Sequence, residues 1–136
     1  MVKKSKDKAG YVRGLVQYVA ENRITLEICL SSNLQTMPLL LGDAANHNFE
    51  KMLENRLSVC LCTDNRLVSN TCMVKEMRLA ADTFKLTPKQ LKDIVIGSFK
   101  RSFNPLPYPE KRAYVRKVID WYEQLEREHG VVAADA

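Results

Sequence analysis

Two short and almost continuous hydrophobic runs occur along the chain, each bounded by polar residues. The first covers Ile24–Leu30 and is interrupted by Thr25 and Glu27, and the second covers Leu57–Cys62. Apolar runs of this length between polar segments are typical of buried β-strands. The pattern therefore predicts two buried strands.

The segments that follow and connect these runs have the residue types of turns. Ser31–Asn33 carries turn-forming side chains, and Pro38 and Gly42 come soon after, so we expect a loop directly behind the first strand. Asn104–Pro109 contains three prolines, which predicts a stiff connector because proline fixes the backbone angle φ.

Hydrophobic residues recur at helical spacing in the rest of the chain. One segment starts with Thr87, Pro88 and Gln90, which together suit a capped helix N-terminus. The predicted helices cover Ala9–Asn22, Asn46–Glu54, Thr71–Phe84, a segment starting at Thr87, and Pro109–Gly130.

The order of these elements predicts an α/β fold. Two apolar strands separated by a helix are expected to pair in parallel. Two parallel strands alone leave unpaired edges, and parallel sheets need cover on both faces. The pattern therefore indicates a piece of a larger α/β fold, and we detect no internal repeat in it.

Length and composition indicate one domain with no membrane span. The chain has 136 residues, of which 46% are hydrophobic and 27% charged, which excludes a multidomain enzyme and wholesale disorder. No run approaches the roughly 18 apolar residues of a membrane helix, and the N-terminus lacks the apolar stretch of a secretory signal.

Neither the net charge of +5 nor the four cysteines indicate a binding or catalytic site. Four of the first eight residues are lysines, but no aromatic side chain lies between them to stack on bases, so we do not expect a nucleic-acid partner. The spacing of Cys60 and Cys62 is poor for a zinc site. We expect buried, reduced thiols and hence a cytoplasmic location.

Asp64 is the sharpest candidate for chemistry, because it comes just past the end of the second strand. Active sites in parallel β/α folds are assembled at the C-terminal ends of the strands. If the strand extends that far, Cys60, Cys62 and Asp64 face the same way. Asp64 then either meets a metal ion or another cation, or caps the following loop through its backbone amides.

The ordered motifs of the chain resemble the C-terminal part of the adenosine deaminase family. Ile24–Thr36 is similar to the seventh strand of the family's barrel and the loop after it, and Leu57–Leu67, with its Thr-Asp-Asn motif, is similar to the eighth. His47-Asn48-Phe49 resembles a His-Pro-Phe helix start, with asparagine in place of proline. The resemblance implies the last two strands of a TIM (β/α)8 barrel with flanking and C-terminal helices.

The activity implied by this resemblance is zinc-dependent hydrolysis of adenosine, a purine nucleoside, to inosine with release of ammonia. Asp64 is then the catalytic carboxylate, which binds Zn²⁺ and orients the metal-activated water. Asn65 takes the place of a second acidic residue that contacts the purine ring. An amide can hydrogen-bond there but supplies no negative charge.

Most of the family's site is expected to lie outside this chain. A barrel of this kind needs about 250 residues, and the family uses several histidines and a glutamate in addition to the aspartate. The chain has two histidines, His47 and His129, and neither follows a predicted strand. We divide the chain into a basic tail at residues 1–9, a barrel portion at 10–130 and a disordered tail at 131–136.

Two functions from different classes remain open. In the first, the chain is part of a zinc-dependent hydrolase that is inactive alone and works beside an N-terminal barrel portion. In the second, it is a catalytically inactive remnant that serves as an interaction or oligomerising module through its unpaired strand edges. Glu27, within the first strand, is expected to be structural because it lies well before the strand's C-terminal end.

Overall fold

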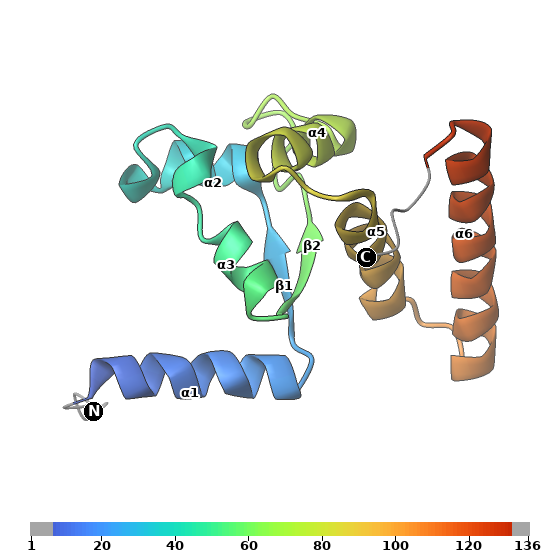
Figure 1. The fold of residues 1–136 in the computed structure, drawn as a ribbon, viewed down its shortest axis with the longest axis horizontal. Helices are drawn as coiled ribbons and strands as arrows, with labels where there is room; N and C mark the ends of the chain where they lie inside the picture. Colours follow the sequence, from blue (N-terminus) through green and yellow to red (C-terminus); the bar gives the residue numbers. More distant parts are fainter. Residues whose placement is uncertain (1–6, 132–136) are drawn as a thin grey trace.

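The computed structural model describes residues 7–131, and its elements follow the predicted order with three additions between the two strands, one short helix and two 3₁₀ turns (Figure 1). Of the predicted disordered tail, residues 132–136 lie outside the described residues, as do the first six residues of the chain. The elements are α1 (Lys8–Glu21), β1 (Thr25–Ile28), α2 (Leu30–Thr36), the 3₁₀ turns η1 (Pro38–Leu40) and η2 (Ala44–Asn46), α3 (Phe49–Glu54), β2 (Ser58–Leu61), α4 (Met73–Phe84), α5 (Pro88–Arg101) and α6 (Tyr108–Glu128).

The two predicted strands pair in parallel, which confirms the prediction of a parallel α/β unit. The register joins Thr25 to Ser58 and Glu27 to Cys60. Because side chains alternate along a strand, these four polar residues share one face of the sheet. The other face carries aliphatic residues and is the one that helices cover.

The hydrophobic core lies between that aliphatic face and helices α3, α4 and α5. Phe49, at the start of α3, is fully buried, and its ring centroid lies 4.9 Å from that of Phe84 at the end of α4. The buried members of the core cluster are Ile28, Leu30, Phe49, Val59, Leu61, Ala80 and Ile94.

The same short motif leads into both strands, a similarity that the sequence analysis missed. Glu-Asn-Arg precedes β1 at Glu21–Arg23 and β2 at Glu54–Arg56. In each copy the asparagine side chain donates to the carbonyl four residues earlier, and the arginine adopts a left-handed backbone with φ of 51° and 55°. The repeated motif therefore ends the helix and turns the chain into the strand in the same way twice.

Ser31–Asn33 does not form the predicted turn. These residues belong to the first turns of α2, a helix that begins directly after β1. Ser and Asn favour turns because their side chains compete for backbone groups, but a carboxylate from α4 satisfies the start of this helix, as described below. The prediction of a loop behind the first strand was wrong for this segment.

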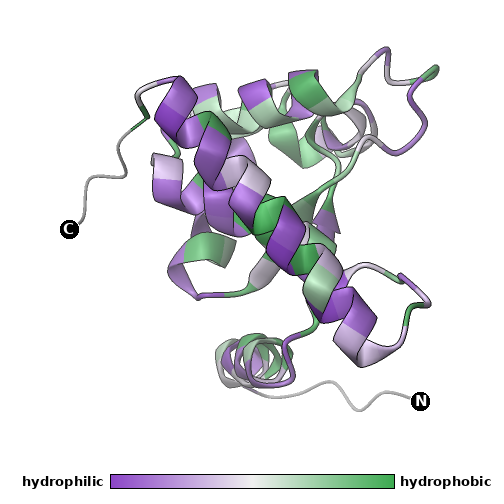
Figure 2. Cartoon of the chain, turned by 90° about the vertical axis from the view of Figure 1, so that its right-hand side faces the viewer, coloured by the Kyte–Doolittle hydropathy of each residue, from purple (hydrophilic) through white to green (hydrophobic). Residues whose placement is uncertain are grey.

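The two outer helices cover the core poorly. No residue of α1 is buried, and Tyr11, Val12 and Tyr18 are more than half exposed. The last helix, α6, stands beside α5 at the edge of the molecule (Figure 1) and buries a single residue, Val115. Figure 2 shows hydrophobic and hydrophilic residues interspersed along α6 where it crosses that side of the molecule.

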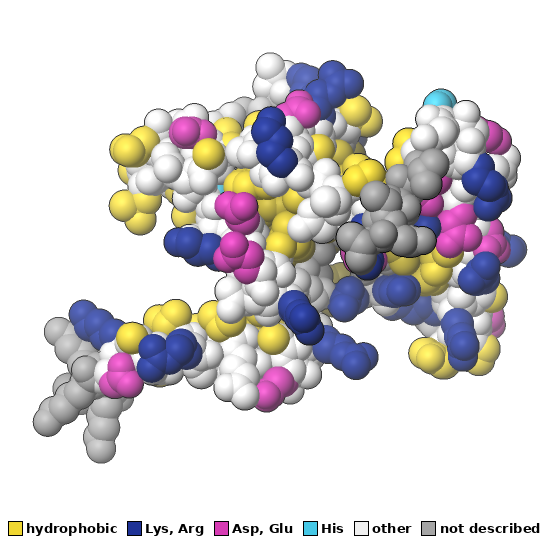
Figure 3. Space-filling view, viewed as in Figure 1, with side chains coloured by type: hydrophobic (Ala, Val, Ile, Leu, Met, Phe, Trp, Pro, Cys, Tyr) yellow, Lys and Arg dark blue, Asp and Glu magenta, His cyan; other side chains and the backbone are white. Residues whose placement is uncertain are grey.

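Hydrophobic side chains consequently reach the surface in several places. They are visible along α1 and over the segment between α2 and α3 (Figure 3), where Leu39 and Leu41 are 86% and 85% exposed. Met73, at the start of α4, is 38% exposed although it lies at helical spacing from Met77 and Ala80. Among the described residues, no helix is both long and apolar enough to cross a membrane.

The start of α5 has the predicted capping box, and it yields a stability prediction. The Thr87 hydroxyl accepts a hydrogen bond from the Gln90 amide at 3.2 Å, and the Gln90 side chain accepts one from the Thr87 amide at 2.9 Å. Thr87→Ala removes the first bond and is expected to lower the free energy of unfolding by about 1 kcal/mol. Urea denaturation measures this, and Thr83→Ala, outside the capping box, is the control.

Candidate functional site

The C-terminal ends of both strands meet at one edge of the sheet, where α2 and the segment leading to α4 begin (Figure 1). Beyond the last residue of β2, the Cys62 amide still donates to the Ile28 carbonyl at 2.9 Å. This bond anchors the chain two residues before Asp64. The position of the candidate aspartate is thus set by the strand pairing.

Asp64 is exposed at this edge and is hydrogen-bonded to the helix that follows the neighbouring strand. Its Oδ2 accepts a hydrogen bond of 2.8 Å from the Ser32 hydroxyl in the first turn of α2. Its backbone is left-handed, with φ of 53°, a conformation that Asp tolerates better than most residues. The carboxylate is therefore presented to solvent at the edge where parallel β/α folds assemble their active sites.

Asn65 performs the loop-capping role that the sequence analysis considered for Asp64. Its Oδ1 accepts hydrogen bonds from the amides of Leu67 and Val68, both at 3.2 Å. This is the local pattern by which Asn side chains stabilise turns. A contact between Asn65 and a purine ring stays a prediction.

Behind Asp64, a fully buried carboxylate ties α4 to the start of α2. Glu76 has 0% exposure. Its Oε1 accepts a 2.6 Å hydrogen bond from the Thr71 hydroxyl, and its Oε2 accepts a 3.2 Å bond from the Ser31 amide. The Ser31 amide is one of those that have no partner within α2, and a negative charge near it is favourable. Glu76 therefore fixes the turn that carries Ser32.

Glu76 was not predicted as a site residue, although one signal for it is present in the sequence. The apolar stripe of α4 passes through Met73, Met77 and Ala80, and Glu76 lies on that same stripe at three and four residues from its members. A carboxylate on the buried side of a helix indicates a hydrogen-bonded polar group, because an unpaired buried charge is very costly. For Ser32, within Ser31–Asn33, the residue types predicted only a turn.

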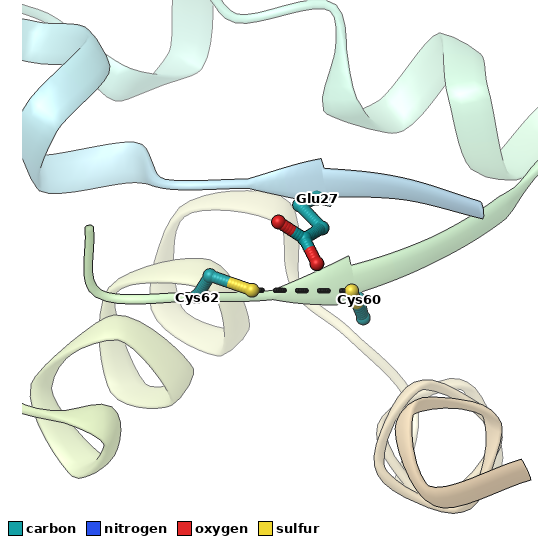
Figure 4. Close-up of side chains that lie close together, drawn as sticks. All are labelled: Glu27, Cys60 and Cys62. Atoms are coloured by element: carbon teal, nitrogen blue, oxygen red, sulfur yellow. Dashed lines mark hydrogen bonds between the residues drawn. The ribbon is translucent and has the colours of Figure 1, made fainter. Parts of the chain in front are cut away.

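The polar face of the sheet carries a second cluster. Glu27 points from β1 toward Cys60 and Cys62, whose sulfur atoms are 4.0 Å apart (Figure 4). Burial and the neighbouring Cys60 raise the pKa of Cys62 to about 11. Burial also raises the pKa of Cys60, against the effects of the Cys62 hydrogen bond and of Arg101. Both pKa shifts favour the neutral thiol over the thiolate.

The cysteines are only partly as predicted. All four are free, as expected for a reduced protein. Cys60 is buried, but Cys29, Cys62 and Cys72 are only half-buried. The expectation that all four thiols are buried was therefore wrong.

The donors that this chain offers around Asp64 do not fit a complete zinc site. Within residues 7–131, Glu27, Cys60 and Cys62 make up the one set of three or more potential ligands whose donor atoms lie within 4.8 Å of one another, and Asp64 is not in it. His47 is buried beside α3, where burial lowers its pKa, and His129 follows the end of α6. A zinc ion needs three or four protein ligands, so Asp64 alone cannot hold one.

A profile of the family described as adenosine deaminase matches residues 2–121. The chain belongs to the adenosine deaminase family. An adenosine deaminase of Mycobacteroides abscessus is 33% identical over 113 residues, which are 83% of this chain and 30% of that protein. An adenosine deaminase of Mycobacterium avium is 34% identical over 105 residues, covering 77% of this chain and 28% of that protein.

The fold is also that of solved deaminase-family structures. Arabidopsis ADAL complexed with IMP is similar with a TM-score of 0.62 at 20% identity, over 83% of this chain and 31% of that one. The chain thus spans about 30% of the length of the adenosine deaminases that it matches. As a member of this family, it is a mixed α/β segment with a two-stranded parallel sheet and helices packed on the aliphatic face of that sheet.

Proposed function

We propose that this chain forms the C-terminal portion of a deaminase (β/α)8 barrel and contributes Asp64 to a metal site that the rest of the barrel completes. The observation that carries the proposal is the Ser32–Asp64 hydrogen bond of 2.8 Å, which joins the C-terminal ends of adjacent parallel strands. Family membership supports the reaction class, hydrolytic deamination of a purine, and the share of the relatives' length that is covered supports the need for a second portion.

The proposed role of Asp64 is limited to what its carboxylate can do. It contributes one oxygen ligand to a Zn²⁺ ion, whose other ligands come from the N-terminal portion. When bound, such an ion makes hydroxide available near neutral pH. The Ser32 hydroxyl occupies one carboxylate oxygen of Asp64 and so fixes the direction in which the carboxylate faces.

For the substrate we propose a purine nucleoside, adenosine in the first place. Asn65 would contact the purine ring, although its side-chain oxygen already accepts the Leu67 and Val68 amides. The related ADAL is complexed with IMP, a nucleotide, so AMP is the second substrate to test. The four free cysteines are consistent with the proposed cytoplasmic location.

Reassembly of the barrel tests this proposal. The N-terminal portion of the Mycobacteroides abscessus relative, without its matched C-terminal segment, is mixed with this chain and Zn²⁺. Release of ammonia from adenosine and from AMP is then measured. We expect neither portion to be active alone and the mixture to deaminate one of the two substrates. A stable complex of the two portions that shows no deamination would contradict the proposal.

The second candidate function is self-association without catalysis. It is favoured by the outer edges of the two-stranded sheet, which have no partner strand among residues 7–131, and by the exposed apolar residues of α1. Unpaired strands are templates for pairing with another chain. Light scattering on the isolated chain decides this candidate, because a monomer at all concentrations would exclude it, and a defined dimer or larger oligomer would support it.

A further inference from the structure

Three potential metal ligands converge on the polar face of the sheet, in a group that does not include Asp64. The carboxylate of Glu27 and the sulfur atoms of Cys60 and Cys62 all lie within 4.8 Å of one another. Figure 4 shows Glu27 directed from β1 toward the two sulfurs on the β2 side. The deaminase proposal assigns no role to this cluster, in which Cys60 is buried, Cys62 is half-buried and Glu27 is exposed.

Although the sequence spacing of Cys60 and Cys62 is poor for a zinc site, the distance between their two sulfur atoms suits a tetrahedral ion. With metal–sulfur bonds of about 2.3 Å and tetrahedral angles, two thiolate ligands lie roughly 3.8 Å apart. The observed separation of Cys60 and Cys62 is 4.0 Å. A disulfide would require the sulfurs to approach to about 2.05 Å, so the arrangement is much closer to that of two ligands than to that of a bonded pair.

The backbone holds these ligands in place. Glu27 and Cys60 are register partners across the parallel pair. Cys62 is fixed by the bond from its amide to the Ile28 carbonyl, at 2.9 Å. Ligands carried by paired strands keep their spacing better than ligands on loops do, so the binding of an ion requires little rearrangement.

The surroundings also suit a cation with two thiolates and a carboxylate. Three anionic ligands around a divalent ion leave a net charge of −1, and the positive charge of Arg101 acts on Cys60 from the end of α5. Glu27, Cys60 and Arg101 line one open groove of about 900 Å³. Water from this groove can supply the fourth ligand.

We infer that Glu27, Cys60 and Cys62 form a binding site for one thiophilic divalent cation of the zinc class, separate from any metal bound through Asp64. Soft thiolate ligands select such ions over Mg²⁺ or Ca²⁺. On binding, two S–H bonds break, two metal–sulfur bonds form and two protons leave to solvent, so no oxidant or reductant takes part.

Cadmium is the probe for this site, because a thiolate-to-cadmium charge-transfer band reports the metal–sulfur bonds directly. We expect Cd²⁺ titration of the whole chain to develop this band with one ion per chain, and Zn²⁺ to displace it. The double variant Cys60→Ser/Cys62→Ser is expected to lose the band. Cys72→Ser, which changes a cysteine outside the cluster, is the matched control and keeps it.

Glu27→Gln provides a test that does not disturb the core, since Glu27 is exposed. It is expected to weaken Cd²⁺ binding at least ~10-fold. Removal of a residue that only supports a metal ligand already lowers metal affinity by about 10–100-fold, and Glu27 is proposed as a ligand itself. The inference would be overturned by an unchanged band in the double variant, by loss of the band in Cys72→Ser, or by unchanged affinity in Glu27→Gln. All these readouts are independent of deamination.

Discussion

Replacing Asp64 with Asn is expected to reduce deamination by the reassembled barrel at least ~100-fold. Loss of a residue that only supports a metal ligand lowers activity by up to about 100-fold, and loss of a ligand itself should lower it more. The amide oxygen of Asn still accepts the Ser32 hydroxyl bond, so the fold of the strand ends should be kept. The measurement is kcat/KM for adenosine, together with the zinc content of the purified complex.

Two control variants separate the roles around Asp64. Asp82→Asn changes an exposed carboxylate on α4 and should leave activity unchanged. Ser32→Ala removes only the hydroxyl that holds Asp64, so we expect a smaller loss of activity than for Asp64→Asn, with zinc still bound. Full activity in Asp64→Asn would show that this carboxylate takes no part in the reaction.

The proposed thiol site changes how metal analysis of this chain must be interpreted. Zinc bound by the isolated chain would at first argue that the site at Asp64 is complete without the N-terminal portion. If Glu27, Cys60 and Cys62 bind an ion, zinc in the isolated chain says nothing about Asp64. Zinc content should therefore be compared between Asp64→Asn and the double cysteine variant, in the chain alone and in the reassembled barrel.

The strands were predictable because their signal is local. Each is an apolar run between polar residues. The position of Asp64 at a strand end follows from that pattern alone. Its partner, Ser32, did not follow, because the residues around it have turn-forming side chains. The contact at the start of this helix comes from Glu76, 45 residues from Ser31, which no local pattern reveals.

The poorly covered helices illustrate another limit of sequence patterns. Apolar residues at helical spacing show that a face is suited to burial, but they do not show what buries it. In α1 the aliphatic residues Val12 and Leu15 are about half exposed. In the proposed complete barrel the remaining portion would cover such faces. The apolar pattern of α1 therefore indicates a contact surface whose partner lies outside the described residues of this chain.

Glu76 is the residue whose loss should most destabilise the site. Glu76→Ala leaves the Thr71 hydroxyl and the Ser31 amide without their acceptor and creates a cavity beside α2. An unsatisfied buried hydrogen-bonding group costs about 1–3 kcal/mol. The Thr71 contact is buried and the Ser31 contact is part-buried, so we expect a loss of roughly 2–4 kcal/mol in the free energy of unfolding. Urea denaturation of the chain measures this loss.

Glu76→Gln separates the contribution of the Glu76 charge to stability from that of its hydrogen bonds and size. The amide can accept the Ser31 bond and donate to the Thr71 oxygen, so only the favourable charge near the start of α2 is lost, about 1 kcal/mol.

Hydrogen exchange of the α2 amides should be faster in Glu76→Ala than in Glu76→Gln, because the first variant releases the helix start from α4. Glu54→Ala, on the exposed end of α3, should stay within about 0.5 kcal/mol of the unmodified chain. Equal exchange of α2 in all three variants would mean that Glu76 does not hold this helix, and that the direction of Ser32 and Asp64 is set by strand pairing alone.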